Sequence, residues 1–257
     1  MNVFKELYKY RELLKTTTQK EVRGKYKHSF LGVLWSFLNP LLQIMVYAIV
    51  FPFILKNNQE HYVVFLCCGI IPWNFFASAI NRSASTMLEN GNIIKKVYFP
   101  REILPISVVT SETVNFVIST LIILAFVLFD GIALTPYILY YPLILIVQYL
   151  LILAISFIVS SITVYIRDIQ HLIGVALQLF FYATPIVYAA NLIPESISWI
   201  LNLNPMTYII NGYRDIFLNQ TAPNVKALMI LLVIVIFACI IAYAIFHKLQ
   251  KGFAEEL

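Results

Sequence analysis

Long apolar segments occupy most of this 257-residue chain. Residues of the AVILMFWYC set make up 60% of the sequence and charged residues only 12%, whereas soluble domains contain about 45–50% and about 25% of these classes. So few charges cannot solvate the surface of an apolar chain of this length. The composition therefore excludes a soluble globular domain, a disordered chain and a coiled coil, and it predicts a polytopic membrane protein.

Six segments are apolar and long enough to cross a bilayer, for which a helix needs about 20 residues. Residues 131–166 carry no charge and exceed one upright span, so we expect a single helix from about Pro142, after an aromatic interfacial piece at Tyr137–Tyr141. The expected fold class is therefore all-α, with six transmembrane helices. The expected spans are Phe30–Leu55, Tyr62–Ala79, Ile103–Phe129, Pro142–Ile166, Leu172–Ala189 and Ala227–Phe246.

Residues 196–213 are uncharged but interrupted by asparagine, glycine and proline. If both termini are cytosolic and this segment does not cross, fifteen Lys and Arg lie inside and three outside, as the positive-inside rule requires. A further crossing would move Lys248 and Lys251 outside. Broken backbone at membrane depth must be covered by protein. We therefore expect residues 191–219 to form re-entrant helices in the outer leaflet, between the fifth and sixth spans.

A basic arm of 29 residues precedes the first expected span and holds eight of the eighteen Lys and Arg. Val3, Leu7, Tyr10 and Leu14 recur at helical spacing, which predicts a cytosolic amphipathic helix along the inner membrane face. The capping-box sequence Thr18–Glu21 predicts that a second helical segment starts there. The alternative is that these charges only anchor the topology. Because the arm adjoins an apolar span, we expect it to bind membrane lipids and not nucleic acid.

The chain lacks the motifs of enzymatic and metal chemistry. Its one Gly-Lys pair, Gly24-Lys25, lacks the first glycine and the hydroxyl residue of a phosphate-binding loop. HExxH and GxSxG are absent, and the three cysteines do not have the spacing of metal ligands. We therefore expect a conduit without enzymatic activity, catalytic residues or a metal. Active transport would draw on another subunit or on an ion gradient.

One acidic residue, Glu112, falls inside an expected span. It lies eleven residues beyond Arg101, and a rise of about 1.5 Å per residue places it near the middle of the bilayer. Ionisable residues at that depth are costly and often functional. A structural hydrogen bond to a neighbouring helix is one interpretation. Proton coupling is the other, although an ion-coupled carrier predicts inverted repeats and further buried ionisable groups, which the sequence does not show.

Aromatic residues are frequent, with 19 Phe, 16 Tyr and 3 Trp. Many fit the belts at membrane interfaces, but two clusters lie within expected spans. Tyr47 and Phe51 are one turn apart in the first span, and residues 180–182 and Tyr188 crowd the outer half of the fifth. Tyrosine combines an apolar face with a polar tip, which suits the C–H faces and hydroxyls of sugars. If these two helices line a path, its outer half is aromatic.

Short motifs rich in proline, aromatic residues and arginine follow one another along the chain. Singly each motif is weak, but their order and spacing are specific. They are Ser29–Trp35 (SFLGVLW), Asn39-Pro40-Leu41, Gly69–Phe76 (GIIPWNFF), Phe99–Pro105 (FPREILP), Tyr165–Ile169 (YIRDI), Thr184–Tyr188 (TPIVY) and Asn204-Pro205-Met206.

In this order the motifs resemble the permease subunits of ABC-2-type polysaccharide exporters, the O-antigen (Wzm) and teichoic acid (TarG) group. The resemblance runs from about residue 10 to the C-terminus. It implies a multi-pass protein of the bacterial inner membrane with cytosolic termini, which forms a homodimer within a 2+2 complex with a separate ABC ATPase subunit. ATP and Mg²⁺ would be bound by that subunit, so we expect no cofactor in this chain. The implied substrate is an undecaprenyl-pyrophosphate-linked polysaccharide, O-antigen or a related cell-surface glycan.

The resemblance also divides the chain into functional segments. Residues 1–29 would be the gate helix that admits the lipid-linked substrate, residues 30–247 the transmembrane domain and residues 248–257 a cytosolic tail. Residues 191–219 would close the exit. The polymer would pass between the first and fifth spans of both protomers. The implied channel residues are Tyr47, Phe51, Phe180, Tyr182 and Tyr188.

Basic residues carry two further expectations. Arg11, Arg23 and Lys25 of the arm would attract the pyrophosphate of the substrate, although topology anchoring also explains them. Residues 88–97 would form the coupling helix that contacts the ATPase subunit. The implied contact residues are Leu88, Asn90, Ile93, Ile94, Lys95 and Lys96.

Two alternatives to polysaccharide export stay open at this point. An ABC-2 permease for drugs or small lipids would share the motifs, but an aromatic path argues against it. An ion-coupled secondary carrier built around Glu112 belongs to a different class of transporter.

Overall fold

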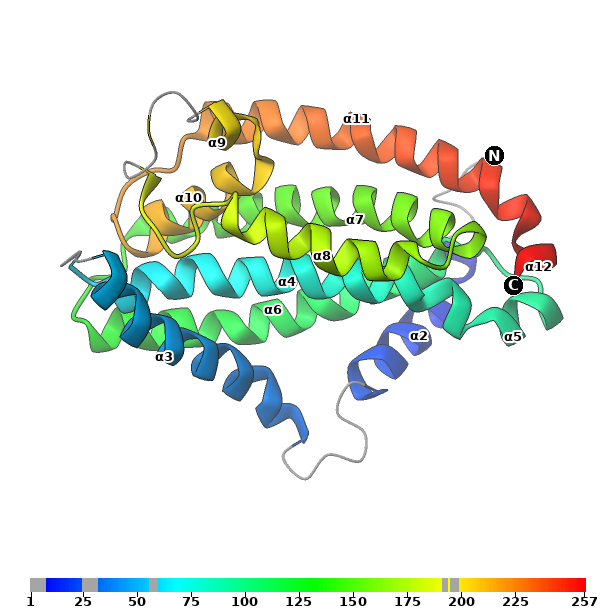
Figure 1. Ribbon diagram of the computed structural model, residues 1–257, viewed down its shortest axis with the longest axis horizontal. Coiled ribbons are helices and arrows are strands. Elements are labelled where there is room, and N and C mark those ends of the chain that lie inside the picture. Colours follow the sequence, from blue (N-terminus) through cyan, green and yellow to red (C-terminus); the bar gives the residue numbers. More distant parts are fainter. Residues whose placement is uncertain (1–7, 25–31, 56–59, 191–193, 195–198) are drawn as a thin grey trace.

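The computed structural model describes residues 8–24, 32–55, 60–190, 194 and 199–257, and every regular element in these ranges is a helix. The helices form an elongated bundle, with α5 and α12 at one end and α9 and α10 at the other (Figure 1). The α-helices are α2 (Arg11–Gly24), α3 (Trp35–Leu55), α4 (Tyr62–Glu89), α5 (Gly91–Lys96), α6 (Ile103–Phe129), α7 (Tyr141–Tyr165), α8 (Ile169–Tyr182), α9 (Trp199–Leu203), α10 (Pro205–Phe217), α11 (Val225–Leu249) and α12 (Phe253–Glu256), and the 3₁₀ helices are η1 (Gly32–Leu34), η2 (Pro136–Tyr140) and η5 (Gln250–Gly252).

Among the described residues, five helical stretches are long and apolar enough to cross a membrane: α3, α4, α6, η2 with α7, and α11 with its C-terminal extension. The apolar helix α8 has 14 residues, about 21 Å at 1.5 Å per residue against a hydrocarbon core of about 30 Å. It nevertheless leads the chain along the bundle from the end that holds α12 toward the end that holds α10 (Figure 1). The prediction of a multi-pass all-helical protein is confirmed.

The expected fifth span, residues 172–189, is helical only as far as Tyr182. Pro185 removes a backbone donor and disfavours helical geometry at the residue before it. The Thr184 hydroxyl donates to the Phe180 carbonyl (2.7 Å), and the Asn204 amide donates to the Thr184 hydroxyl (2.8 Å). These bonds tie the turn after α8 to the start of α10, so the helix is shorter than hydropathy alone predicted.

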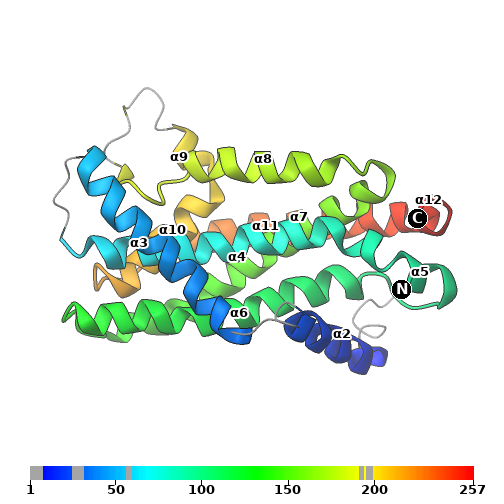
Figure 2. The same cartoon turned by 60° about the horizontal axis from the view of Figure 1, so that its bottom comes forward.

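Other boundaries also differ from their predictions. The capping-box prediction at Thr18–Glu21 is wrong, because α2 continues through these residues without a break. The aromatic piece before α7 is confirmed as η2. The region predicted to be re-entrant contains α9 and α10, while its residues 191–193 and 195–198 lie outside the described residues. Within residues 1–29, α2 packs along α6 (Figure 2) and has no fully buried side chain.

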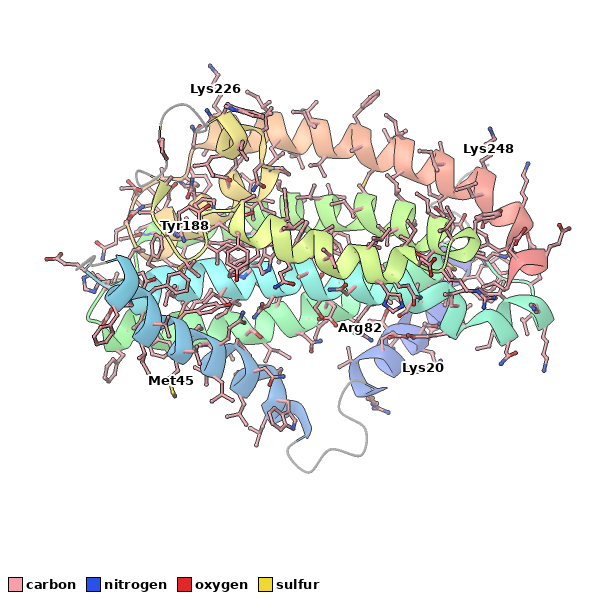
Figure 3. All side chains as sticks on the ribbon, in the orientation of Figure 1. Lys20, Met45, Arg82, Tyr188, Lys226 and Lys248 are labelled. Atoms are coloured by element: carbon pink, nitrogen blue, oxygen red, sulfur yellow. The ribbon has the colours of Figure 1, made fainter. Side chains whose placement is uncertain are left out.

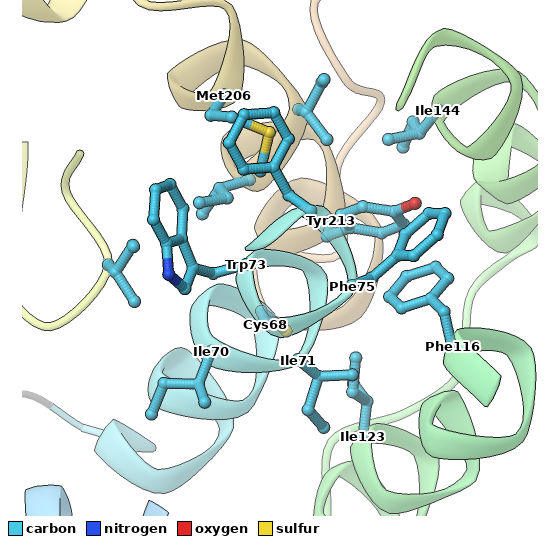
Figure 4. Packing of buried hydrophobic residues seen from close by; sticks show 14 of the residues in the cluster. Cys68, Ile70, Ile71, Trp73, Phe75, Phe116, Ile123, Ile144, Met206 and Tyr213 are labelled. Atoms are coloured by element: carbon cyan, nitrogen blue, oxygen red, sulfur yellow. The ribbon is translucent and has the colours of Figure 1, made fainter. Parts of the chain in front are cut away.

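Helix α4 forms the centre of the bundle. Its ten consecutive residues Val64–Trp73 are all buried, a pattern that requires neighbours on every side of a helix. Phe75 of α4 stacks on Phe116 of α6, with ring centroids 5.0 Å apart, and Tyr213 of α10 meets Phe116 at 5.6 Å. Figure 4 shows these rings converging from three helices. The core therefore depends on α4 being apolar around its whole circumference.

A buried glutamine connects three of the helices through hydrogen bonds. Gln148 of α7 donates from Nε2 to the Pro72 carbonyl of α4 (2.8 Å) and accepts from the Tyr213 hydroxyl of α10 (3.0 Å). Both polar ends of this fully buried side chain are therefore satisfied, as buried amides require. The two bonds fix the rotation of α7 and α10 around α4.

Close backbone approach makes Gly69 of α4 sensitive to substitution. A Cβ at this position would lie 2.8 Å from the Ile186 carbonyl oxygen and 3.2 Å from a guanidinium nitrogen of Arg214. We expect Gly69→Ala to destabilise the protein by about 1–3 kcal/mol, because backbone atoms must move to admit the methyl group. A fall in the thermal unfolding midpoint of the purified protein measures this. The control is Gly174→Ala in α8, where a Cβ meets nothing within 4 Å; an equal fall in both variants would contradict the prediction.

Candidate functional site

Aromatic rings from α3, α4 and α8 meet toward the end of the bundle that holds α10. Tyr47 of α3 lies 5.5 Å from Phe51 in an edge-to-face arrangement and 6.0 Å from Phe181 of α8. Trp73 of α4 contacts Phe181 at 5.7 Å and Phe180 at 6.0 Å. Such edge-to-face and tilted pairs are the favoured geometries of aromatic side chains. The two clusters predicted on separate spans thus form one aromatic group.

The predicted channel residues differ in the exposed fraction of their side chains. Phe180 is half-buried against Trp73, whereas Tyr182 is 60% exposed. The Tyr188 hydroxyl, which points back from the turn after α8, donates to the Tyr182 carbonyl (2.8 Å). The sequence placed Phe181 in the aromatic cluster but not among the channel residues, and it missed Trp73, because ring counts along one helix do not show which face meets the next helix. Tyr188 lies beside α8 and near α10 (Figure 3).

The open sides of α8 and α11 have different polarity. On α8, the polar side chains His171, Gln178 and Tyr182 are exposed together with Leu172, Val175 and Leu179. On α11, every exposed side chain between Met229 and Ile245 is apolar. A polar side chain facing lipid is costly, so the mixed surface of α8 suits a partner with both polar and apolar groups, whereas α11 suits lipid.

Arg82 of α4 joins two carboxylates from different helices. It donates from Nη1 to Glu112 of α6 at 2.5 Å and from Nη2 to Glu21 of α2. Glu112 is 3% exposed at its side chain, Arg82 26%. Charge-assisted bonds of this kind are roughly twice as strong as neutral ones. Arg82 thus connects α2 to α4 and α6 through two ion pairs.

The ion pair also bears on the two interpretations of Glu112. The carboxylate lies well inside α6, as expected, and its partner is the permanently charged guanidinium of Arg82. An arginine cannot accept a proton from a carboxylic acid and pass it on. The contact therefore favours the structural interpretation over a proton relay.

A cavity of about 760 Å³ adjoins Arg82 between α2 and α4. Lys20 and Arg23 of α2 line it, together with Glu21, Glu89 and Asn90. Figure 3 shows Lys20 and Arg82 on these neighbouring helices. The three cations outnumber the two carboxylates of this lining, so the opening has an excess of positive charge that attracts an anion.

Of the three arm residues predicted to attract pyrophosphate, Arg11 and Arg23 lie toward opposite ends of α2. Arg23 lines this cavity. Arg11, at the other end of α2, lies over the Tyr8 ring at 4.6 Å and donates to the Tyr8 carbonyl (3.3 Å). Lys25 falls outside the described residues. Lys20 and Arg82 are cations of this site that the sequence did not single out.

The predicted coupling segment is a short helix at the end of α4. Leu88 still belongs to α4, and α5 follows after the single residue Asn90. Asn90 and Ile94 are buried, so they hold the segment in place and offer no contact surface. The exposed residues are Asn92, Ile93, Lys95, Lys96, Val97 and Tyr98.

The C-terminal tail packs beside this segment. Gly91 lies next to Leu257, and Arg101 donates to the Gln250 carbonyl and lies 5.8 Å from the Phe253 ring. Buried Glu102 accepts hydrogen bonds from Tyr243 and Gln250. The end of α11 is thereby connected to α5.

Arg214 secures the turn after α8 at the opposite end of the bundle. Its guanidinium is buried, lies 3.5 Å from the centroid of the Phe65 ring and donates to the Ile186 carbonyl (2.8 Å). The Tyr62 hydroxyl donates to the neighbouring Val187 carbonyl (2.8 Å). α4 and α10 therefore hold residues 183–188 against the core.

Comparisons with known proteins agree with this geometry. Residues 12–218 match the ABC-2 type transporter family. The chain is 37% identical over 249 residues to the O-antigen export system permease protein RfbA of Klebsiella pneumoniae, covering 96% of this chain and 95% of that protein. It is 33% identical over 259 residues to the protein of the same name from Myxococcus xanthus, covering 100% of both chains. The chain belongs to the ABC-2 transporter family of membrane permeases.

Proposed function

We propose that this chain is the membrane subunit of an ATP-driven exporter of lipid-linked cell-surface polysaccharide. The observation that carries the proposal is its similarity, over nearly the whole chain, to three proteins named as permeases of O-antigen export. This similarity favours a polysaccharide over the drugs or small lipids that other permeases carry. It also favours a subunit without enzymatic activity over an ion-coupled carrier.

In this proposal the chain crosses the bacterial inner membrane six times. α8 and the turn after it make the fifth crossing, because Ile186 and Val187 are buried against the protein and the irregular backbone is thereby shielded from lipid. Most Lys and Arg lie in the segments expected on the inner side of the membrane, and this bias favours a cytosolic location of both termini. α9 and α10 then lie at the outer side, where residues 191–219 close the exit.

The proposed channel lies between two copies of the chain, along α3 and α8 of each. Its support is the aromatic group around Tyr47 and the exposed polar side chains of α8, which stand among apolar ones, whereas α11 exposes apolar side chains between Met229 and Ile245. Flat rings with polar tips at Tyr182 and Tyr188 offer sugars both stacking and hydrogen bonds. Phe51 and Phe180 complete this lining.

The lipid-linked substrate would reach the channel from the cytosolic side, next to α2. The diphosphate of an undecaprenyl carrier is attracted to the cavity lined by Lys20, Arg23 and Arg82. The roles of Arg11 and Lys25 stay predictions. Because Glu21 and a phosphate oxygen compete for the same guanidinium, substrate binding would loosen α2 from α4.

A separate ABC ATPase subunit would bind the exposed side of α5, where Ile93, Lys95, Lys96 and Tyr98 are accessible. ATP and Mg²⁺ belong to that subunit. Movement of α5 would reach α4 through Asn90 and α11 through the C-terminal tail. In this way, closure of the two ATPase subunits would move the two permease subunits apart.

Affinity purification of the tagged chain from its native membrane tests the ATPase partner. We expect a nucleotide-binding subunit in equal amounts, whose ATPase activity changes when the lipid-linked glycan is added. A chain that purifies without any ATPase subunit would refute the proposed complex.

Single cysteines test the six-crossing topology. The positive-inside distribution predicts that Asn219→Cys reacts with a membrane-impermeant thiol reagent from outside and that Lys248→Cys does not. Both positions are exposed, and residues 226 and 248 lie at opposite ends of α11 (Figure 3). Cys67 and Cys68 are buried, and the partly exposed Cys239 is first replaced by serine, so that the labelling background is small. Labelling of Lys248→Cys from outside would overturn the topology.

Alanine substitutions test the aromatic channel. We expect Tyr47→Ala and Tyr182→Ala to lower the export rate by up to about tenfold, since an aromatic contact contributes about 0.5–1.5 kcal/mol. Polymer reaching the cell surface measures the rate, and complex assembly should be unchanged. The matched control is Phe237→Ala on α11, because Phe237 is 65% exposed and Tyr182 60%. Normal export in both tyrosine variants would rule out this lining.

A further inference from the structure

Polar residues form a line on each of three neighbouring apolar helices. Within each line the spacing is three or four residues, which places the members on one face of a helix. These faces interrupt segments that are otherwise apolar. The lines are Ser36, Asn39 and Gln43 on α3, Asn74, Ser78 and Arg82 on α4, and Glu112, Asn115 and Ser119 on α6.

Hydrogen bonds show that the three lines face one another. Asn74 donates from its side-chain amide to the Gln43 side-chain carbonyl (2.8 Å), joining α4 to α3. The Ser119 hydroxyl donates to the Ser36 carbonyl (3.5 Å), joining α6 to α3. Polar side chains that bridge helices in this way are a usual means of packing in membranes, but these bridges do not fill the space between the helices.

A cavity of about 340 Å³ lies between the three lines. Its volume falls within the range of about 300–1,000 Å³ that small-molecule sites occupy. α3 diverges from the bundle toward its N-terminal end (Figure 1), which leaves this room. The polar residues that line the cavity are Ser36, Asn39, Asn74, Ser78, Glu112, Asn115 and Ser119.

Asn115 provides a buried amide donor at the wall of the cavity. Its side chain lines the cavity and the residue is only 7% exposed, yet its Nδ2 has no hydrogen-bond partner in the part of the chain that the structure describes. Buried amide groups nearly always have a partner, because an unmade hydrogen bond costs about 1–3 kcal/mol. Among the described residues, the contacts between the helices therefore leave the Asn115 amide donor without an acceptor.

The chemistry of the lining defines the occupant. Three amides and three hydroxyls offer donors and acceptors without net charge, and the carboxylate of Glu112 is paired with Arg82. Trp35, Phe75 and Phe116 add aromatic faces to these polar groups. A sugar combines C–H faces with hydroxyl groups and therefore fits this mixed lining better than an acyl chain or a phosphate does. On the strength of the proposed function, we propose that this cavity binds the first sugar of the lipid-linked substrate.

The position of the cavity supports this assignment. Glu112 lines it, while Arg82 lines the cationic cavity beside α2, and the two side chains are 2.5 Å apart. The two cavities therefore meet at one ion pair. A diphosphate at Lys20, Arg23 and Arg82 would place the sugar that it carries directly at the polar cavity. The cationic cavity would thus bind the diphosphate, and the polar cavity next to it would bind the sugar attached to that diphosphate.

Binding of two lipids to the complete complex in lipid nanodiscs tests the proposal. The probes are undecaprenyl diphosphate and the same lipid carrying one N-acetylglucosamine. We expect the sugar-bearing lipid to bind about tenfold more tightly, because two neutral hydrogen bonds contribute about this much. Asn115→Leu, which keeps the side-chain volume, should abolish the preference without weakening the bare lipid. Arg82→Gln should weaken both lipids.

The controls separate this proposal from a general loss of structure. Thr113→Val lies on the same helix, where Thr113 only donates to the Val109 carbonyl, and it should keep the preference. Ser78→Ala is the milder second variant, in case Asn115→Leu does not assemble. The sugar subsite would be overturned if the wild type bound both lipids with equal affinity. It would also be overturned if both cavity variants kept the preference for the sugar-bearing lipid. Neither result would contradict polysaccharide export. Failure of the wild type to bind either lipid would overturn the lipid-linked substrate as well.

Discussion

Inside a bilayer an apolar side chain gains little by exchanging lipid for protein, so the polar contacts between spans decide how the helices fit together. In this protein three of those contacts connect most of the helices. Arg82 joins α2, α4 and α6 near the end that holds α5. Toward the other end, Gln148 joins α4, α7 and α10 through Tyr213, and the next residue, Arg214, joins α10 to the turn after α8.

All three contacts include or adjoin α4, which gives this helix a second function beyond filling the core. It receives α5 at one end through Asn90, carries Arg82 beside the cationic cavity and supports the turn after α8 through Gly69. In the proposed function, a displacement at α5 would therefore act on both the substrate side and the far side of the bundle. One continuous helix, α4, connects the proposed ATPase contact to the proposed channel.

Much of the fold could be predicted because hydropathy reports directly on membrane helices. The segments for α3, α4, α6, α7 and α11 were found, and the motif order indicated the family that the comparisons show. The candidate site was predicted less well. Tyr47 and Tyr182 were chosen, yet the ring that contacts both of them is Phe181, which in turn contacts Trp73, and Arg82 was not singled out. Periodicity gives the face of one helix and does not say which other helix will cover it.

The sequence by itself determined that the chain is a helical membrane permease, because composition, span length and motif order depend only on local residues. Tertiary structure alone decided the partners of its polar residues. Glu112 became half of an ion pair, and Thr184 after α8 received a hydrogen bond from Asn204, because side chains distant in sequence supplied the partners. Arg82 and Glu112 are thirty residues apart, and a contact across that interval exists only once α4 and α6 have packed together. Long-range polar pairing is a property of the packed bundle, and in a membrane it fixes the site.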